Sequence, residues 1–116
     1  TTAMSVTIYH NPRCSKSRTT LALLQDNNAR PVVIEYLNTP PSAAELKNIL
    51  SLLGLAPRGL LRAKEAKEAG LDDPSLSDDA LIAAMVANPI VIERPIVVAG
   101  GKAKIGRPPE SVLDIL

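Results

Sequence analysis

The stretch SVTIYHNPRCSKSR, residues 5–18, joins a strand pattern to the start of a helix. Residues 5–9 are rich in β-branched side chains, which predicts a short strand, and a Pro-containing loop follows. A helical pattern then runs from about Ser15 to Gln25, and Asp26-Asn27-Asn28 closes it. Cys14, the only cysteine in the chain, therefore lies at the end of this loop, directly before the first turn of the helix.

The position of Cys14 predicts a reactive thiolate. Unpaired backbone N–H groups and the positive end of the helix dipole meet at a helix N-terminus, and both favour the thiolate over the thiol. Arg13, Lys16 and Arg18 add positive charge within four residues of the sulfur. The simpler interpretation is a small buried hydrophobic residue, and the neighbouring cations argue against it.

The rest of the chain alternates strand and helix patterns, which predicts an α/β fold. Further strands are expected at 32–37, 95–99 and 102–105, and helices at 42–53, 77–87 and 107–116, with a short turn near 57–62 and a charged stretch at 63–69. Ser42-Ala43-Ala44-Glu45 is a capping box, Gly54 ends its helix, and Gly100-Gly101 forms a hairpin turn. The order βαβ, helical insert, ββα predicts a mixed four-stranded sheet with a parallel first pair.

Length and composition predict one domain over residues 1–116, with an aliphatic core because two Tyr are the only aromatic residues. A net charge of +1 and the lack of a long apolar run indicate neither nucleic acid nor a membrane as partner. A single cysteine cannot form an internal disulfide, which favours the cytoplasm. One Cys with one His falls short of a zinc site, so no metal is expected, and a monomer suffices.

Three arginines at element boundaries are candidates for binding an oxyanion. Arg62, Arg94 and Arg107 each lie next to a predicted strand or helix end, and arginine presents a rigid fork of donors to tetrahedral anions. Each alone is more simply a solvated surface arginine; as a set they indicate an anion site. His10, four residues before the thiol, either lowers the thiol pKa as an imidazolium or orients the loop through a hydrogen bond.

Spacing excludes two other cysteine chemistries. Cysteine-dependent phosphatases need an arginine six positions after the nucleophile, where this chain has Thr20. A thioredoxin-type dithiol needs a second cysteine three positions on, where this chain has Ser17. Any redox chemistry at Cys14 therefore requires an external thiol.

Five motifs occur in order along the chain: Tyr9-His10-Asn11-Pro12-x-Cys14-x-x-Ser17-Arg18, Leu61-Arg62, Asn88-Pro89, Arg94-Pro95-Ile96-Val97-Val98, and Arg107-Pro108 with Val112-Leu113-Asp114-Ile115-Leu116. In these motifs, and over nearly its whole length, the chain resembles the glutaredoxin-coupled arsenate reductases, a family of the thioredoxin-like fold. Within the family, the short arsenate-reductase-related subgroup is the most similar.

The resemblance implies a reaction and its participants. Cys14 would attack arsenate and form a covalent arseno-cysteine, while Arg62, Arg94 and Arg107 would hold the oxyanion. Glutathione would act as co-substrate by attacking the adduct, and glutaredoxin would reduce the resulting species and release arsenite. No bound cofactor is implied.

The resemblance also implies supporting roles around the thiol. His10 would lower the cysteine pKa, Ser17 would hydrogen-bond the sulfur, and the Arg94-Pro95 peptide bond would be cis. Asn11 and Arg18 belong to the same loop motif and would support the site.

Two other functions remain open at this point. The same thiol could reduce glutathione mixed disulfides, which would make the protein a thiol oxidoreductase that ignores arsenate. Alternatively, the chain could be a non-enzyme like the related Spx-type regulators, which bind RNA polymerase. Regulators of that type with a redox switch carry Cys-x-x-Cys, and Ser17 removes the second cysteine here.

Overall fold

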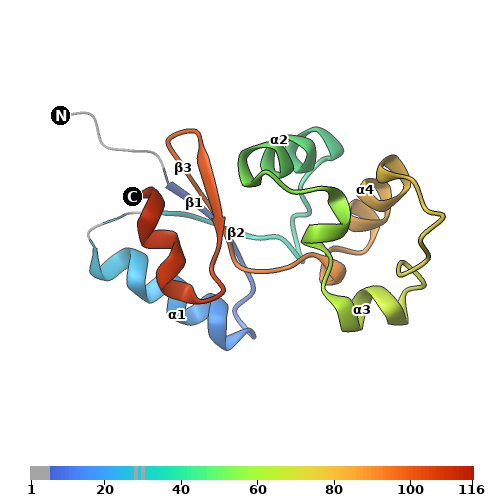
Figure 1. The fold of residues 1–116 in the computed structure, drawn as a ribbon. Coiled ribbons are helices and arrows are strands. Elements are labelled where there is room, and N and C mark those ends of the chain that lie inside the picture. The colour runs from blue at the N-terminus through green and yellow to red at the C-terminus, as the bar shows by residue number, and fades with distance from the viewer. Residues whose placement is uncertain (1–5, 28, 30) are drawn as a thin grey trace. The chain divides into compact units, whose positions relative to one another are not determined.

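A computed structural model describes residues 6–27, 29 and 31–116 of the chain (Figure 1). The chain forms two compact units, one of Thr1–Thr39 with Arg94–Leu116 and one of Pro40–Glu93. Ser5 and Asn28, expected in the first strand and at the end of the first helix, lie outside the described residues.

The first unit is built on a mixed four-stranded sheet, which confirms the predicted α/β class. Its strands are β1 (Val6–His10), β2 (Val32–Glu35), β3 (Ile96–Ala99) and β4 (Lys102–Ile105), in the order β2-β1-β3-β4. Strand β1 runs parallel to β2 and antiparallel to β3, and β3 and β4 form a hairpin. Gly100 and Gly101 form its turn with φ values of 54° and 82°, a left-handed conformation that glycine adopts without steric cost.

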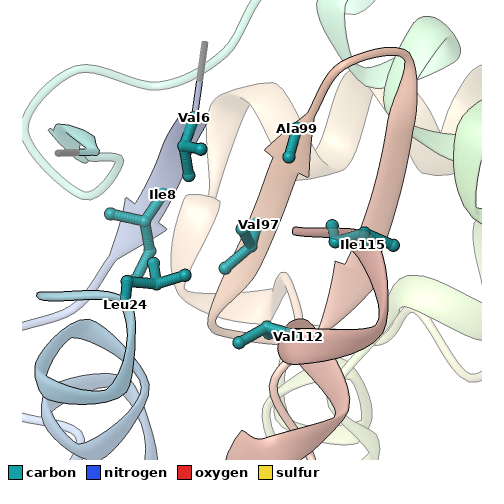
Figure 2. Packing of buried hydrophobic residues seen from close by; sticks show 7 residues of the cluster. All are labelled: Val6, Ile8, Leu24, Val97, Ala99, Val112 and Ile115. Carbon is teal, nitrogen blue, oxygen red and sulfur yellow. The ribbon is translucent and has the colours of Figure 1, made fainter. Parts of the chain in front are cut away.

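Two helical segments of the first unit, α1 (Ser15–Asp26) and the C-terminal 3₁₀ helix η3 (Pro109–Ile115), lie side by side (Figure 1). Both contribute to one apolar cluster with alternate residues of β1 and β3 (Figure 2). The cluster consists of Val6, Ile8, Leu24, Val97, Ala99, Val112 and Ile115, all buried. Its packing holds α1, through Leu24, and η3, through Val112 and Ile115, against β1 and β3.

The ends of two strands differ from those expected, each for a local reason. Strand β1 extends through His10, because His10 pairs in register with Glu35; His10 is thus the last residue of a strand and not a loop residue. Strand β2 ends at Glu35, because the N–H groups of Asn38 and Thr39 both turn back to donate to the Glu35 carbonyl.

The third difference is the kind of C-terminal helix. The expected helix over 107–116 starts only at Pro109 and is a 3₁₀ helix. Its hydrogen bonds span three residues, as between the Ser111 N–H and the Pro108 carbonyl at 3.0 Å. Two consecutive prolines remove donors from the first turn, and 3₁₀ geometry is common in such short segments.

The second unit is helical, which confirms the predicted helical insert. It contains α2 (Ala43–Leu53), η1 (Pro57–Leu60), α3 (Ala63–Glu68), α4 (Asp78–Ala87) and η2 (Pro89–Val91). Helix α2 begins with the capping box of Ser42 and Glu45 and ends at Gly54, whose φ is 71°. Helix α4 packs against α2, η1 and η2. None of the described helices combines the length and apolar composition needed to cross a membrane.

Candidate active site

Cys14 is the N-cap residue of α1. Its backbone is extended (φ −92°, ψ 122°), and its carbonyl accepts the first helical hydrogen bond from the Arg18 N–H at 3.0 Å. Its own N–H donates to the Asn11 carbonyl at 3.0 Å, which closes the loop after β1. The thiol is therefore held at the open N-terminus of α1, and it remains partly exposed.

The pKa of the Cys14 thiol is lowered by the fold. Burial of the sulfur works in the opposite direction, but the backbone N–H of Ser17, the Arg94 side chain and the backbone N–H of Lys16 outweigh it. Both N–H groups belong to the first turn of α1, so it is the N-terminus of the helix that stabilises the thiolate. The thiolate is thus stabilised where the sequence predicted, although the cation responsible is Arg94 and not a neighbour in sequence.

Arg94 precedes β3 and Arg107 follows β4, and the start of β3 is paired with the end of β4. Both arginines therefore lie at the open end of the hairpin and converge on the sulfur. The Arg107 Nη2 atom lies 3.8 Å from the Cys14 sulfur, and its Nε donates to the Arg94 carbonyl at 2.8 Å. Arg94 itself is buried and hydrogen-bonds the sulfur through its side chain. The peptide bonds before Pro95 and Pro108 are both cis, of which only the first was implied by the resemblance.

A buried polar network supports the loop from behind. The His10 Nδ1 atom lies 2.6 Å from the Ser17 hydroxyl oxygen, which also accepts the Asn11 N–H at 3.0 Å. Burial lowers the pKa of His10, and Arg18 adds to this, while Glu35 acts in the opposite direction. The ring is therefore neutral at neutral pH and orients the loop by hydrogen bonding, which was one of its two expected roles.

Ser17, Asn11 and Arg18 act on the backbone around the thiol. Ser17 reaches the sulfur through its N–H, because its hydroxyl is bonded to His10 and Asn11. The Asn11 side-chain oxygen accepts the Arg13 N–H at 3.0 Å, and Arg18 donates to the Pro12 carbonyl at 3.2 Å. These contacts fix the path of the loop that carries Cys14.

Arg62, the third candidate arginine, belongs to the second unit. Its guanidinium forms ion pairs with Glu65 at 3.1 Å and with Glu93 at 3.5 Å, and it is partly buried. Its backbone N–H donates to the Val91 carbonyl at 2.8 Å. Arg62 is thus a well-anchored arginine, and its part in binding an oxyanion at Cys14 stays a prediction.

Sequence reasoning missed Gly106 and Thr20 as residues that shape the site. A Cβ atom on Gly106 would lie 2.5 Å from the Thr20 hydroxyl oxygen and 2.8 Å from Pro95, both far below van der Waals contact. Thr20 is fully buried, and its hydroxyl donates to the Lys16 carbonyl within α1. Only glycine lets the end of β4 approach α1 this closely, and that approach brings the next residue, Arg107, to the sulfur. The position of Gly106 between the predicted strand and Arg107-Pro108 was the signal in the sequence that could have identified it.

A Gly106→Ala substitution tests this close approach. We expect a loss of about 1–3 kcal/mol in the free energy of unfolding, the usual cost of overpacking a tight contact. Denaturant unfolding measures it. Gly59→Ala is the matched control, because its Cβ would meet only Leu55 at 3.4 Å. Equal losses in the two variants would contradict the close-approach account.

Alkylation rates can test which arginine stabilises the Cys14 thiolate. The rate of iodoacetamide reaction should fall as pH drops through the Cys14 pKa, with a midpoint below that of an ordinary cysteine because the folded pKa is lowered. Arg94→Ala should move the midpoint to higher pH. Arg13→Ala should leave it in place, although Arg13 is adjacent in sequence. A shift with Arg13 and none with Arg94 would contradict this assignment.

Within the described part of the chain, no three His, Cys, Asp or Glu side chains gather as metal ligands. The chemistry available is that of a nucleophilic sulfur anion with two guanidinium groups beside it. Such a group can attack a tetrahedral oxyanion whose charge the arginines neutralise.

Comparison with known proteins places this geometry in a family. A model of the ArsC family matches residues 9–115. The uncharacterized protein YfgD of Escherichia coli K12 is 60% identical over 114 residues, covering 96% of both chains. An arsenate reductase of Neisseria meningitidis serogroup A is 50% identical over 114 residues, covering 96% of this chain and 97% of that protein. A solved structure titled arsenate reductase from Vibrio cholerae superposes with a TM-score of 0.95 at 58% identity, covering 99% of this chain and all of that one.

Proposed function

Because the chain belongs to the ArsC family, we propose that it reduces arsenate to arsenite, with glutathione and glutaredoxin supplying the electrons. The observation that carries the proposal is the meeting of the Cys14 sulfur, the N-terminus of α1 and two arginine side chains. Relatives named arsenate reductase, at about half identity over almost the whole chain, support the same reaction.

In the first step, the Cys14 thiolate attacks arsenic. A sulfur–arsenic bond forms, and one arsenate oxygen leaves as hydroxide, which is protonated to water. Arsenic keeps its oxidation state in this exchange. Arg94 and Arg107 neutralise the charge on the remaining oxygens, and the lowered pKa of Cys14 increases the fraction of the nucleophile that is ionised.

The second and third steps transfer two electrons. A glutathione thiol displaces another oxygen as water, which leaves arsenic bonded to two sulfurs. A glutaredoxin thiolate then attacks the glutathione sulfur; the arsenic–sulfur bond breaks, and its electron pair remains on arsenic, now reduced. Water displaces Cys14 and frees arsenite. In total, one arsenate and two thiols give arsenite, one disulfide and one water.

The reaction needs a supply of reduced glutathione, and that supply suggests where the protein acts. Such a pool exists in the cytoplasm, where free thiols persist. We therefore place the protein there. One copy of the chain supplies Cys14, Arg94 and Arg107, so the proposed mechanism requires no oligomer.

Turnover can be followed as NADPH consumption with arsenate, glutathione, glutaredoxin and glutathione reductase. We expect arsenate-dependent oxidation of NADPH that disappears in Cys14→Ser, because a serine hydroxyl has neither the low pKa nor the nucleophilicity of the thiol. Circular dichroism of the variant should show an intact fold. No arsenate-dependent rate, together with reduction of a glutathione mixed disulfide, would contradict the proposal and favour a thiol oxidoreductase.

The oxyanion site can be mapped by protecting Cys14 from alkylation. Arsenate or sulfate should slow the reaction, and Arg94→Ala or Arg62→Ala should weaken that protection about ten-fold or more, since one charge-assisted contact contributes about 1.5–3 kcal/mol. Lys102→Ala, which removes an exposed cation on β4, is the control. If both arginine variants are protected like the unmodified protein, arginine binding of the oxyanion is wrong.

A further inference from the structure

A hollow of about 350 Å³ opens beside the Cys14 loop, on the side facing β2. Its walls come from the loop after β1 and from the turn after β2, through Pro12, Arg13, Glu35, Leu37 and Asn38. The volume falls in the range of small-molecule sites, about 300–1,000 Å³. It lies beyond the carboxyl ends of two parallel strands, where α/β sheets commonly bind ligands.

The lining of the hollow carries both signs of charge. Arg13 supplies one guanidinium and Glu35 one carboxylate, while Asn38 supplies an amide and Leu37 an apolar surface. This set complements a ligand that bears an ammonium and a carboxylate on a short peptide. A purely anionic oxyanion would gain nothing from Glu35.

The opposite side of the Cys14 loop has a different character. Arg94 and Arg107, from the β3–β4 side, present only positive charge to the sulfur. The strand order β2-β1-β3-β4 puts β2 and the β3–β4 hairpin on opposite sides of β1, the strand that leads into Cys14. Only positive charge thus reaches the sulfur from the hairpin, whereas the loop before Cys14 borders a hollow of mixed charge.

We propose that this hollow binds glutathione, with Glu35 facing the ammonium of its γ-glutamyl group and Arg13 one of its carboxylates. The inference rests on the proposed function, and it adds the place from which the second thiol approaches. Glutathione is a tripeptide with one ammonium and two carboxylates, so the arginine side alone would repel its ammonium. Asn11, Pro12 and Arg13, which line the hollow, belong to the loop that ends at Cys14, so a ligand held there lies next to the residue that carries the sulfur.

Binding of S-methylglutathione, an unreactive analogue, tests the proposal without turnover. Glu35→Lys and Arg13→Glu should each raise its dissociation constant at least five-fold in an NMR titration, and the double variant, with both charges exchanged, should recover part of the loss. Glu35→Gln should give a smaller loss in the same direction. Glu35 is exposed at the end of β2, and losing its carboxylate lowers the pKa of His10 further, so that ring stays neutral. Lys102→Glu is the matched charge-reversal control.

Steady-state kinetics then separate this inference from the proposed reaction. The Glu35 and Arg13 variants should raise KM for glutathione at least five-fold, leave arsenate protection of Cys14 unchanged, and behave normally with uncharged 2-mercaptoethanol. Charge-dependent binding of S-methylglutathione without any arsenate turnover would uphold the hollow and overturn the proposed reaction. Normal turnover with unchanged S-methylglutathione binding would overturn the hollow. An effect on KM for glutaredoxin alone would assign this surface to the protein partner and also overturn it.

Discussion

The site depends on the close approach of the β4 end to the first turns of α1. Gly106 lies against Thr20 and Pro95 with no room for a Cβ, and Arg107 follows at once with its guanidinium 3.8 Å from the Cys14 sulfur. The same crossing lets Arg107 donate to the Arg94 carbonyl, which ties the two arginines together. An electropositive site at a helix N-terminus thus follows from the tight contact of Gly106 with the Thr20 and Pro95 side chains, while the apolar cluster holds α1 and η3 against the sheet.

The lowered pKa of Cys14 depends on the contacts that hold the loop before α1 in place. Stabilising a partly buried thiolate works against desolvation, and only aligned N–H groups and a nearby guanidinium reverse the direction of the pKa shift. The neutral His10 ring, bonded to Ser17, and the Asn11 backbone keep those N–H groups in place. These residues orient the N–H groups, whereas the positive charge near the sulfur comes from Arg94 and Arg107 beside the β3–β4 hairpin.

Much of the fold and part of the site could be predicted from the sequence, because the signals are local. The capping box at Ser42, the Gly100-Gly101 turn and the βαβ pattern are each determined by residues close together in the sequence. All three predictions were confirmed. The position of Cys14 at the start of a helix is local in the same sense. The neighbouring sequence cannot show which distant cation reaches the sulfur. The importance of Arg94, the burial of Thr20 and the constraint on Gly106 all arise from packing between segments far apart in the chain.

The most direct test of the account is a crystal structure of the protein prepared with arsenate and no thiol donor. The account predicts arsenic bonded to the Cys14 sulfur, with its oxygens within hydrogen-bond distance of the Arg94 and Arg107 guanidinium groups and the β2-side hollow free of arsenate. Arsenate bound elsewhere, or held by the arginines while the sulfur of a catalytically competent protein stays unbonded, would contradict the claim that Cys14 is the nucleophile.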